Sequence, residues 1–325
     1  MTLVFDPQAL EQACAFNRKL AWLPRFKITN RVMPVLVQSL LQLSQVNADG
    51  KLRRAGVSVV QRRVQVDEQD VPVKVRILRA AQPRPPRGVV IDFHGGGWAI
   101  GNAAMNDQLN AELVAACDVV VVSVDYRLAT FTPLASIMDD CLVAARWLLA
   151  GGLPDCDGLP VCVVGESAGG HLAAATLLRL KAWPVLLAKV AGAVLYYGVY
   201  DLAGTARVRA AGPETLLLHG PTMQSSMRLL TPGLSDAERR QAPLSPLYGD
   251  LSGLPPALLF AGDRDPLRDD TMLMAQAWRQ QASAPVECHM VPEAAHGFIR
   301  FPIAMAAMVR QHVHAWISQR CASAA

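Results

Sequence analysis

The sequence lacks the segments that would place a protein in or across a membrane. None of its uncharged apolar runs approaches the ~20 residues that a membrane-spanning helix requires. The N-terminus contains Asp6 and Glu11 without a basic start or an apolar segment, so we expect no signal peptide. The seven cysteines, an odd number, are interpreted as buried hydrophobes or free thiols in a reducing compartment. We therefore expect a cytoplasmic protein with no stable membrane insertion.

Motifs for metals, nucleotides and nucleic acids are also absent. The chain has no His-Glu-x-x-His, no paired Cys-x-x-Cys and no Gly-x-Gly-x-x-Gly. The net charge is +4, but the basic residues are scattered, and pairs such as Arg53-Arg54 are the longest clusters. Such pairs are usually solvated surface. We expect no cofactor, no metal and no nucleic-acid partner; a homodimer is an open alternative.

Apolar sequence is abundant, at 52% of the residues, which is enough for a sizeable core. Two alternating segments, 57–66 and 71–78, are joined by a polar connection that suits an antiparallel hairpin. Continuous apolar runs, separated by helical stretches, follow at 89–93, 119–124, 161–164, 193–197, 257–261 and 286–291. This alternation indicates parallel strands with helices on both faces. We predict one α/β domain over residues 1–325, with an eight-stranded, mostly parallel sheet flanked by helices.

Two segments fall outside this alternation. Residues 1 to about 50 are mostly helix-like, with Leu36 and Leu40 among apolar residues at near-helical spacing. The interval from about 200 to 247 lacks strand-like runs and is rich in turn residues and short helical patterns. We interpret this interval as an insertion over the carboxyl edge of the sheet, where ligands bind in such folds.

Ser167 stands at the centre of the run Gly165-Glu166-Ser167-Ala168-Gly169. A β-branched run precedes it and an alanine- and leucine-rich helical pattern follows, which predicts a strand, a sharp turn and a helix. Glycine at 165 and 169 removes side chains that would collide with the neighbouring strand or helix. The serine hydroxyl is then exposed, and the Ala168 N–H can point at a developing oxyanion. We predict that Ser167 is a nucleophile.

The run His94 to Trp98 contains three consecutive glycines directly after a predicted strand. Glycines let the backbone approach a ligand closely and turn its N–H groups inward. Gly95, Gly96 or Gly97, together with Ala168, could therefore form an oxyanion hole. A plain glycine turn between strand and helix is the alternative.

An acid and a base follow in the chain. The run 257–261 leads into Asp263 and Asp265, and we favour Asp265 because a proline stiffens the turn after it; Asp263 could instead bond its own backbone. His296 lies beside a glycine in a loop before the final helix, free to reach a serine. The order Ser167, Asp265, His296 is the one expected for α/β-hydrolases, in which the histidine deprotonates the serine and the aspartate orients it.

Taken together, these motifs resemble the hormone-sensitive-lipase-like branch of the α/β-hydrolases, the bacterial esterase group, from about residue 70 to 315. The resemblance implies a carboxylic ester hydrolase, commonly on short to medium acyl chains, with a helical cap built from about 1–50 and about 200–247. It also implies Ser167 as nucleophile, Asp265 as acid and His296 as base. The motifs that carry it are His94–Trp98, Asp125–Ala129, Gly165–Gly170, Ser245–Leu247, Asp265–Asp269 and His296–Phe298.

The chain departs from the family pattern at two places. Glu166 precedes the serine where the family usually has Asp, and Thr130-Phe131 stands where Pro-Glu is usual. Glutamate at the first position is found in carboxylesterases of the cholinesterase type. Those enzymes are far longer and use a glutamate as the acid, so length and Asp265 argue against that group.

We therefore predict a cofactor-free serine esterase that acts on a small-molecule ester through an acyl-enzyme intermediate. Two alternatives stay open. Amide hydrolysis, as by an arylformamidase, uses the same machinery, and a ligand-binding receptor could be built on a retired hydrolase scaffold. Receptors of this fold typically lack the base histidine, which is retained here.

Apolar residues near the predicted site are candidates for a substrate pocket that favours hydrophobic esters with small acyl groups. Packing of the cap on the body is an equally good explanation for each of them. The candidates are Trp98 beside the glycine turn, Trp22, Phe26, Met33 and Leu36 in the first cap segment, and Met223, Met227 and Leu230 in the second.

Overall fold

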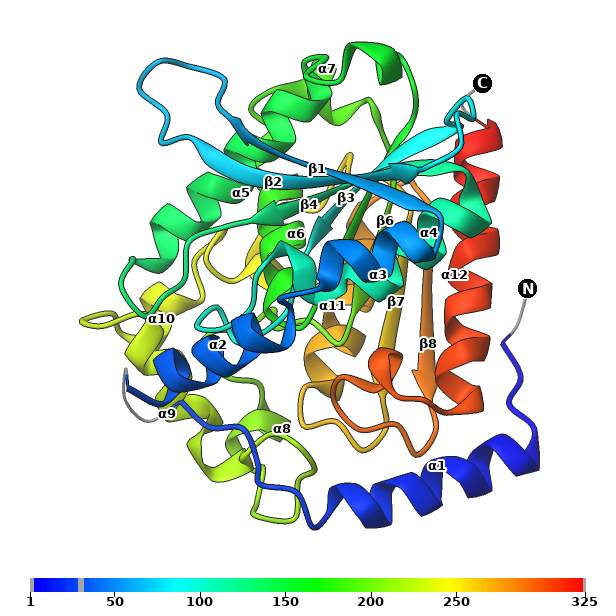
Figure 1. The fold of residues 1–325 in the computed structure, drawn as a ribbon. Coiled ribbons are helices and arrows are strands. Elements are labelled where there is room, and N and C mark those ends of the chain that lie inside the picture. The colour runs from blue at the N-terminus through cyan, green and yellow to red at the C-terminus, as the bar shows by residue number, and fades with distance from the viewer. Residues whose placement is uncertain (1–2, 29–31, 324–325) are drawn as a thin grey trace.

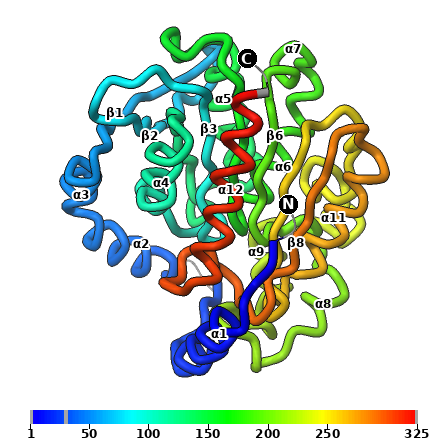
Figure 2. The backbone as a smooth tube through the Cα atoms, turned by 90° about the vertical axis from the view of Figure 1, so that its right-hand side faces the viewer, coloured from blue at the N-terminus to red at the C-terminus, as the bar shows by residue number. Residues whose placement is uncertain are grey.

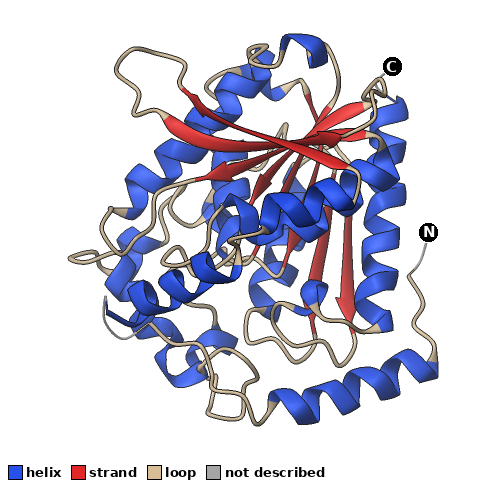
Figure 3. Cartoon of the chain, in the orientation of Figure 1, coloured by secondary structure: helices blue, strands red, loops and turns tan. Residues whose placement is uncertain are grey.

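The computed structural model describes residues 3–28 and 32–323, and its architecture confirms the predicted fold class. A twisted eight-stranded sheet runs through the centre with helices on both sides (Figure 3). The strand order is β1-β2-β4-β3-β5-β6-β7-β8. The strands are β1 (Val57–Val64), β2 (Val73–Ala80), β3 (Gly88–Phe93), β4 (Val119–Asp125), β5 (Val161–Glu166), β6 (Val190–Tyr196), β7 (Ala257–Gly262) and β8 (Val286–Val291).

Within the described sheet, β2 is the one strand that runs against the others. It pairs antiparallel with both β1 and β4, whereas every other neighbouring pair is parallel. The predicted hairpin is present, and β1 therefore points in the same direction as the parallel strands. β6 begins at Val190 rather than at 193, because Gly192 interrupts the apolar run while its backbone still pairs with Cys162.

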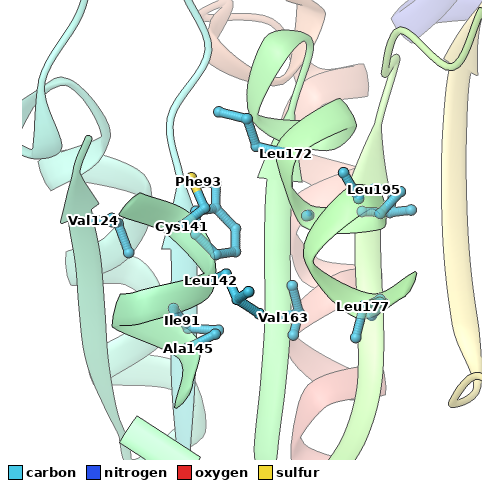
Figure 4. Packing of buried hydrophobic residues seen from close by; sticks show 14 of the residues in the cluster. Ile91, Phe93, Val124, Cys141, Leu142, Ala145, Val163, Leu172, Leu177 and Leu195 are labelled. Atoms are coloured by element: carbon cyan, nitrogen blue, oxygen red, sulfur yellow. The ribbon is translucent and has the colours of Figure 1, made fainter. Parts of the chain in front are cut away.

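Helices cover both faces of the sheet and bury two layers of apolar side chains. The first face carries α5 (Leu134–Leu149), α6 (Ala168–Leu180) and α11 (Arg268–Gln281); the second carries α4 (Asp107–Cys117) and α12 (Ala304–Ser323). Figure 4 shows the first layer, in which Leu142 of α5 and Leu172 of α6 pack towards Phe93 and Val163 of the strands. Within the described residues, no helix combines the length and the apolar character needed to cross a bilayer.

The remaining helices are shorter or lie near the N-terminus. They are α1 (Pro7–Leu20), α2 (Val32–Ser44), α3 (Ala48–Arg54), α7 (Pro184–Leu187), α8 (Ala206–Arg209), α9 (Met223–Leu230) and α10 (Asp236–Arg239). The 3-10 helices are η1 (Ala103–Asn106), η2 (Pro154–Cys156), η3 (Gly220–Thr222), η4 (Pro246–Tyr248) and η5 (Phe298–Arg300).

The two segments predicted to form a cap meet each other at one end of the molecule. The Phe26 carbonyl accepts a hydrogen bond from the His219 N–H at 3.0 Å, within an isolated parallel bridge between Phe26 and Leu218. Helices α8 and α9 pack together at the end towards which β7 and β8 point (Figure 1). Helix α1 is held to the body separately, since Asn17 donates to the Glu293 carbonyl at 2.6 Å.

Candidate active site

Ser167 lies at the turn between β5 and α6 with a left-handed backbone, φ 54° and ψ −119°. Such a conformation is costly for a residue with a side chain and persists only when its surroundings enforce it. A Cβ on Gly165 would collide with the Gly169 carbonyl, and one on Gly169 would collide with the Phe93 carbonyl. The turn therefore needs glycine at both positions, as the sequence predicted.

A chain of hydrogen bonds joins the three residues that follow the ends of β5, β7 and β8. His296 Nε2 lies 2.8 Å from Ser167 Oγ, and His296 Nδ1 lies 2.8 Å from Asp265 Oδ2. Because a carboxylate only accepts, Nδ1 carries the proton and Nε2 is free to accept from the serine hydroxyl. Asp265 is fully buried and its Oδ1 accepts from the Leu267 N–H at 2.8 Å. Asp263, the alternative acid, makes no contact of this kind with His296 in the described chain.

The glycine turn after β3 faces the turn between β5 and α6 that carries Ser167, which we call the elbow. The Gly95 N–H is directed at Glu166 Oε1, at 3.4 Å. Gly96 and Gly97 both have positive φ, 110° and 59°. Across residues 3–28 and 32–323, the N–H groups of Gly96, Gly97 and Ala168 have no hydrogen-bond partner. Three backbone donors are thus free, of which Ala168 follows the serine directly and Gly97 lines the same cavity as Ser167, whereas Gly95 is engaged with Glu166.

Two buried histidines make contacts at the two ends of the glycine turn, His94 at its start and His171 with Trp98 at its end. His94 stacks on Tyr126 with ring centroids 4.1 Å apart, and the Tyr126 hydroxyl donates to the His94 carbonyl at 2.6 Å. His171 accepts from the Trp98 indole N–H at 3.2 Å and donates to the Leu244 carbonyl at 2.8 Å. Burial lowers the pKa of each histidine to about 4, so both are neutral.

An ion pair between the buried Glu166 carboxylate and the partly exposed Arg300 side chain ties the elbow to the segment after His296, and sequence reasoning missed it. Arg300 donates its Nε to both carboxylate oxygens of Glu166 at 3.0 Å, and Tyr197 donates to Oε2 at 2.9 Å. Burial alone would raise the pKa of Glu166, but the Arg300 charge and these hydrogen bonds lower it below its usual value. The departure from aspartate at 166 was the available signal, because the longer side chain reaches Arg300.

An apolar cavity of about 70 Å³ opens at Ser167. Its lining includes five of the predicted pocket residues, namely Trp98, Phe26, Met223, Met227 and Leu230. The other lining residues are Lys27, Ile28, Gly97, Ser167, Val199, Leu218, His219, Thr222, Ser226 and Leu267. The structure does not bring the other pocket candidates to this cavity. The side chains of Trp22, Met33 and Leu36 are 90%, 49% and 55% exposed and do not line it. Leu218, which does line it, lies in an irregular segment with no periodic signal.

The fold and this arrangement of serine, histidine and aspartate define a hydrolase of the α/β class. Residues 90–300 match the model of a family described as "alpha/beta hydrolase fold". The chain belongs to this family, in its hormone-sensitive-lipase-like branch, which confirms the predicted resemblance.

Known relatives agree with this placement. The chain is 32% identical to carboxylesterase NlhH of Mycobacterium tuberculosis over 246 residues, 73% of this chain and 74% of the relative. It superposes on an esterase of Pyrobaculum calidifontis with a TM-score of 0.80 and 25% identity, covering 94% and 97% of the two chains. For esterase LipW of Mycobacterium marinum the TM-score is 0.80, the identity 28% and the coverage 99% of both. The protein is a carboxylesterase-type hydrolase, as predicted.

Proposed function

We propose that the protein is a serine esterase that hydrolyses small-molecule esters with small acyl groups through an acyl-enzyme intermediate. The observation that carries the proposal is the position of His296, whose two ring nitrogens each lie 2.8 Å from an oxygen, Ser167 Oγ on one side and Asp265 Oδ2 on the other. This geometry suits a nucleophile, a general base and a carboxylate that orients the base.

In the first half-reaction, Ser167 Oγ attacks the ester carbonyl while His296 Nε2 takes the hydroxyl proton. The carbonyl oxygen becomes an oxyanion, which we assign to the free N–H groups of Gly96, Gly97 and Ala168. When the tetrahedral intermediate collapses, the bond to the alcohol oxygen breaks and His296 returns the proton to that oxygen. Water then attacks the acyl-serine by the same route, which releases the acid and restores Ser167.

The size of the cavity supports small acyl groups. A dry cavity of about 150 Å³ holds benzene, whereas the cavity at Ser167 has about 70 Å³. On this scale it accepts a chain of roughly two to four carbons. Its lining includes Leu218, Met223 and Met227, so the group it accepts is apolar.

The test is hydrolysis of p-nitrophenyl butyrate by Ser167→Ala. We expect kcat to fall by about 10⁴-fold or more, with the melting temperature and circular dichroism unchanged. Ser225→Ala is the matched control, because Ser225 lies on α9 and donates only to the Thr222 carbonyl in the described chain. Unchanged turnover in Ser167→Ala contradicts the assignment, and ligand binding without any turnover by the native protein favours a receptor.

Three further measurements define the substrate and the intermediate. A rate series from acetyl to palmitoyl esters should peak within the first few members; rates that increase steadily to long chains, or that need a lipid interface, contradict the small-acyl assignment. Matched ester and amide substrates with one acyl group separate the esterase from the arylformamidase type. A stoichiometric burst of p-nitrophenol before the steady state is the expected sign of the acyl-enzyme.

A further inference from the structure

We propose that the chain carries a zinc-type divalent metal site formed by Glu287, His289 and His312. Glu287 and His289 lie on β8 and His312 lies on α12, which run side by side in Figures 1 and 2. None of the three contacts Ser167 or lines its cavity. The site is therefore separate from the proposed esterase centre.

The two elements present their side chains to each other by ordinary periodicity. Residues 287 and 289 are two apart on a strand and share one face, and His312 and Trp316 are four apart on a helix and share one face. The ligand atoms of the three residues all lie within 4.8 Å of one another. Such a group has no local sequence signature, because its members come from a strand and a helix more than twenty residues apart.

The distances are close to those that zinc requires. Glu287 Oε2 and His289 Nε2 are 3.8 Å apart, and the rings of His289 and His312 meet edge to face with centroids 5.0 Å apart. Tetrahedral zinc with bonds of about 2.0–2.2 Å separates its ligand atoms by roughly 3.4 Å. Small side-chain rotations would close the set around one ion. Imidazole and carboxylate ligands suit zinc and its first-row neighbours rather than calcium.

Two buried nitrogens in this cluster have no hydrogen-bond partner. The Nε2 atoms of His289 and His312 are both inaccessible and unpaired within the described chain, and the His312 residue is only 8% exposed. Buried polar atoms are nearly always satisfied, so an orphan pair needs an explanation.

The carboxylate of Glu287 is held in place by a neighbouring side chain and is reached by solvent. The indole N–H of Trp316 donates to Glu287 Oε1 at 3.0 Å, which fixes the carboxylate and leaves Oε2 facing His289. Carboxylates that ligate a metal are commonly held by a second group in this way. The Glu287 side chain is 35% exposed, so an ion can enter from solvent and keep a water as its fourth ligand. Bound metal would join β8 to α12 and stabilise the fold.

The experiment is zinc titration of the full-length protein after treatment with a chelator, in competition with a chromophoric chelator. We expect one site in the native protein, weakened at least tenfold in His312→Gln and in Glu287→Gln. His314→Gln is the matched control, since positions 312 and 314 of α12 do not share a face. Cys288→Ser is a second control, because that thiol faces Met272 at 3.8 Å on the other side of β8. Both controls should bind zinc as the native protein does.

Two more readouts make the outcome decisive. Cobalt should give a visible absorption spectrum of four- or five-coordinate metal in the native protein and not in Glu287→Gln. Zinc should raise the melting temperature of the native protein and of His314→Gln by a few degrees, on the order expected for a ligand that binds only the folded state. Equal zinc binding by all variants, or none below millimolar zinc, overturns the proposal. Esterase activity of the variants reports that they are folded.

Discussion

The sheet and the N-terminal cap segment differ in how much of each is buried. All six residues of β5, which leads to Ser167, are buried. Helix α2 is as apolar as many core helices, yet Pro34 is the one buried residue among its described side chains. Packing therefore fixes β5, whereas α2 is held by a few polar contacts, such as the Gln38 amide on the backbone of Gly101. Regions with few buried contacts open at lower free energy.

This difference in burial separates the proposed triad from the residues that line the cavity. The three residues of the proposed triad, Ser167, Asp265 and His296, all follow strands of the buried sheet. The residues that line the cavity at Ser167, such as Phe26, Leu218 and Met227, come from irregular segments and from the short helix α9. Changes beside the proposed triad should therefore affect stability and rate together, whereas changes in the lining of the cavity should affect which acyl group is preferred.

The largest effect is expected for Arg300→Met in the body. The substitution leaves the buried Glu166 carboxylate without its cationic partner, although the Tyr197 hydroxyl still donates to it. Because the Arg300 side chain is itself 29% exposed, we expect the free energy of unfolding to fall by about 3 kcal/mol, the lower end for a broken buried pair. Because the pKa of Glu166 is lowered in the folded state, this stabilisation exists above the ordinary pKa of glutamate and is lost as the pH falls through the lowered value. Urea unfolding at pH 7 measures the loss.

The double variant Glu166→Gln with Arg300→Met is the control for that prediction, since it removes both charges and should recover part of the stability. A single variant as stable as the native protein would show that the ion pair does not hold the elbow. Activity should fall as well, because Arg300 joins the elbow to the segment that follows His296.

The ion pair also shows where sequence reasoning ends. Ser167, Asp265 and His296 could be selected because each stands in a local motif after a strand-like run, in an order that the fold constrains. Glu166 and Arg300 are 134 residues apart and no local pattern joins them. Less of the cap structure could be predicted from the sequence. Periodicity does not distinguish Trp22, which is exposed, from Phe26, which lines the cavity. Burial in the cap depends on contacts between short segments, and these leave no period in the sequence.

The second prediction concerns the buried histidines of the body. The folded-state pKa of His171 is about 4, below the ordinary value of 6.5, so the unfolded chain binds more protons between these pH values. The free energy of unfolding should therefore fall by about 2 kcal/mol per such histidine between pH 7 and pH 5. His171→Gln should remove that share of the pH dependence.

The quantity compared between the variant and the native protein is the change in the free energy of unfolding from pH 7 to pH 5. A loss of stability that is the same at both pH values does not alter this quantity. Ser225→Ala on α9 is the control, because it removes no titratable group, and it should keep the native pH dependence. An unchanged slope in His171→Gln would mean that other groups cause the acid sensitivity.

The third prediction moves to the cap and to selectivity. Met227 is 4% exposed and lines the cavity at Ser167, so Met227→Ala adds room for about three more chain atoms. We expect the ratio of kcat/KM for hexanoyl over acetyl esters to increase by about tenfold, the usual size of such pocket effects. Met272→Ala on α11, where the side chain is 41% exposed, should leave the ratio unchanged. A ratio that stays constant in Met227→Ala would place the acyl group elsewhere.

The smallest effect is expected on the outer face of α2. Leu40 is 66% exposed, and replacing it with glutamine removes no buried contact, so the free energy of unfolding should change by less than about 0.5 kcal/mol. Leu52 of α3 is the matched leucine in the same N-terminal segment, but it is 4% exposed and packs in the core. Leu52→Gln should cost about 2 kcal/mol or more, since a polar group then replaces buried apolar surface. If Leu40→Gln costs as much as Leu52→Gln, α2 is buried in solution, and the measured oligomeric state of the two variants then decides whether a second copy covers it.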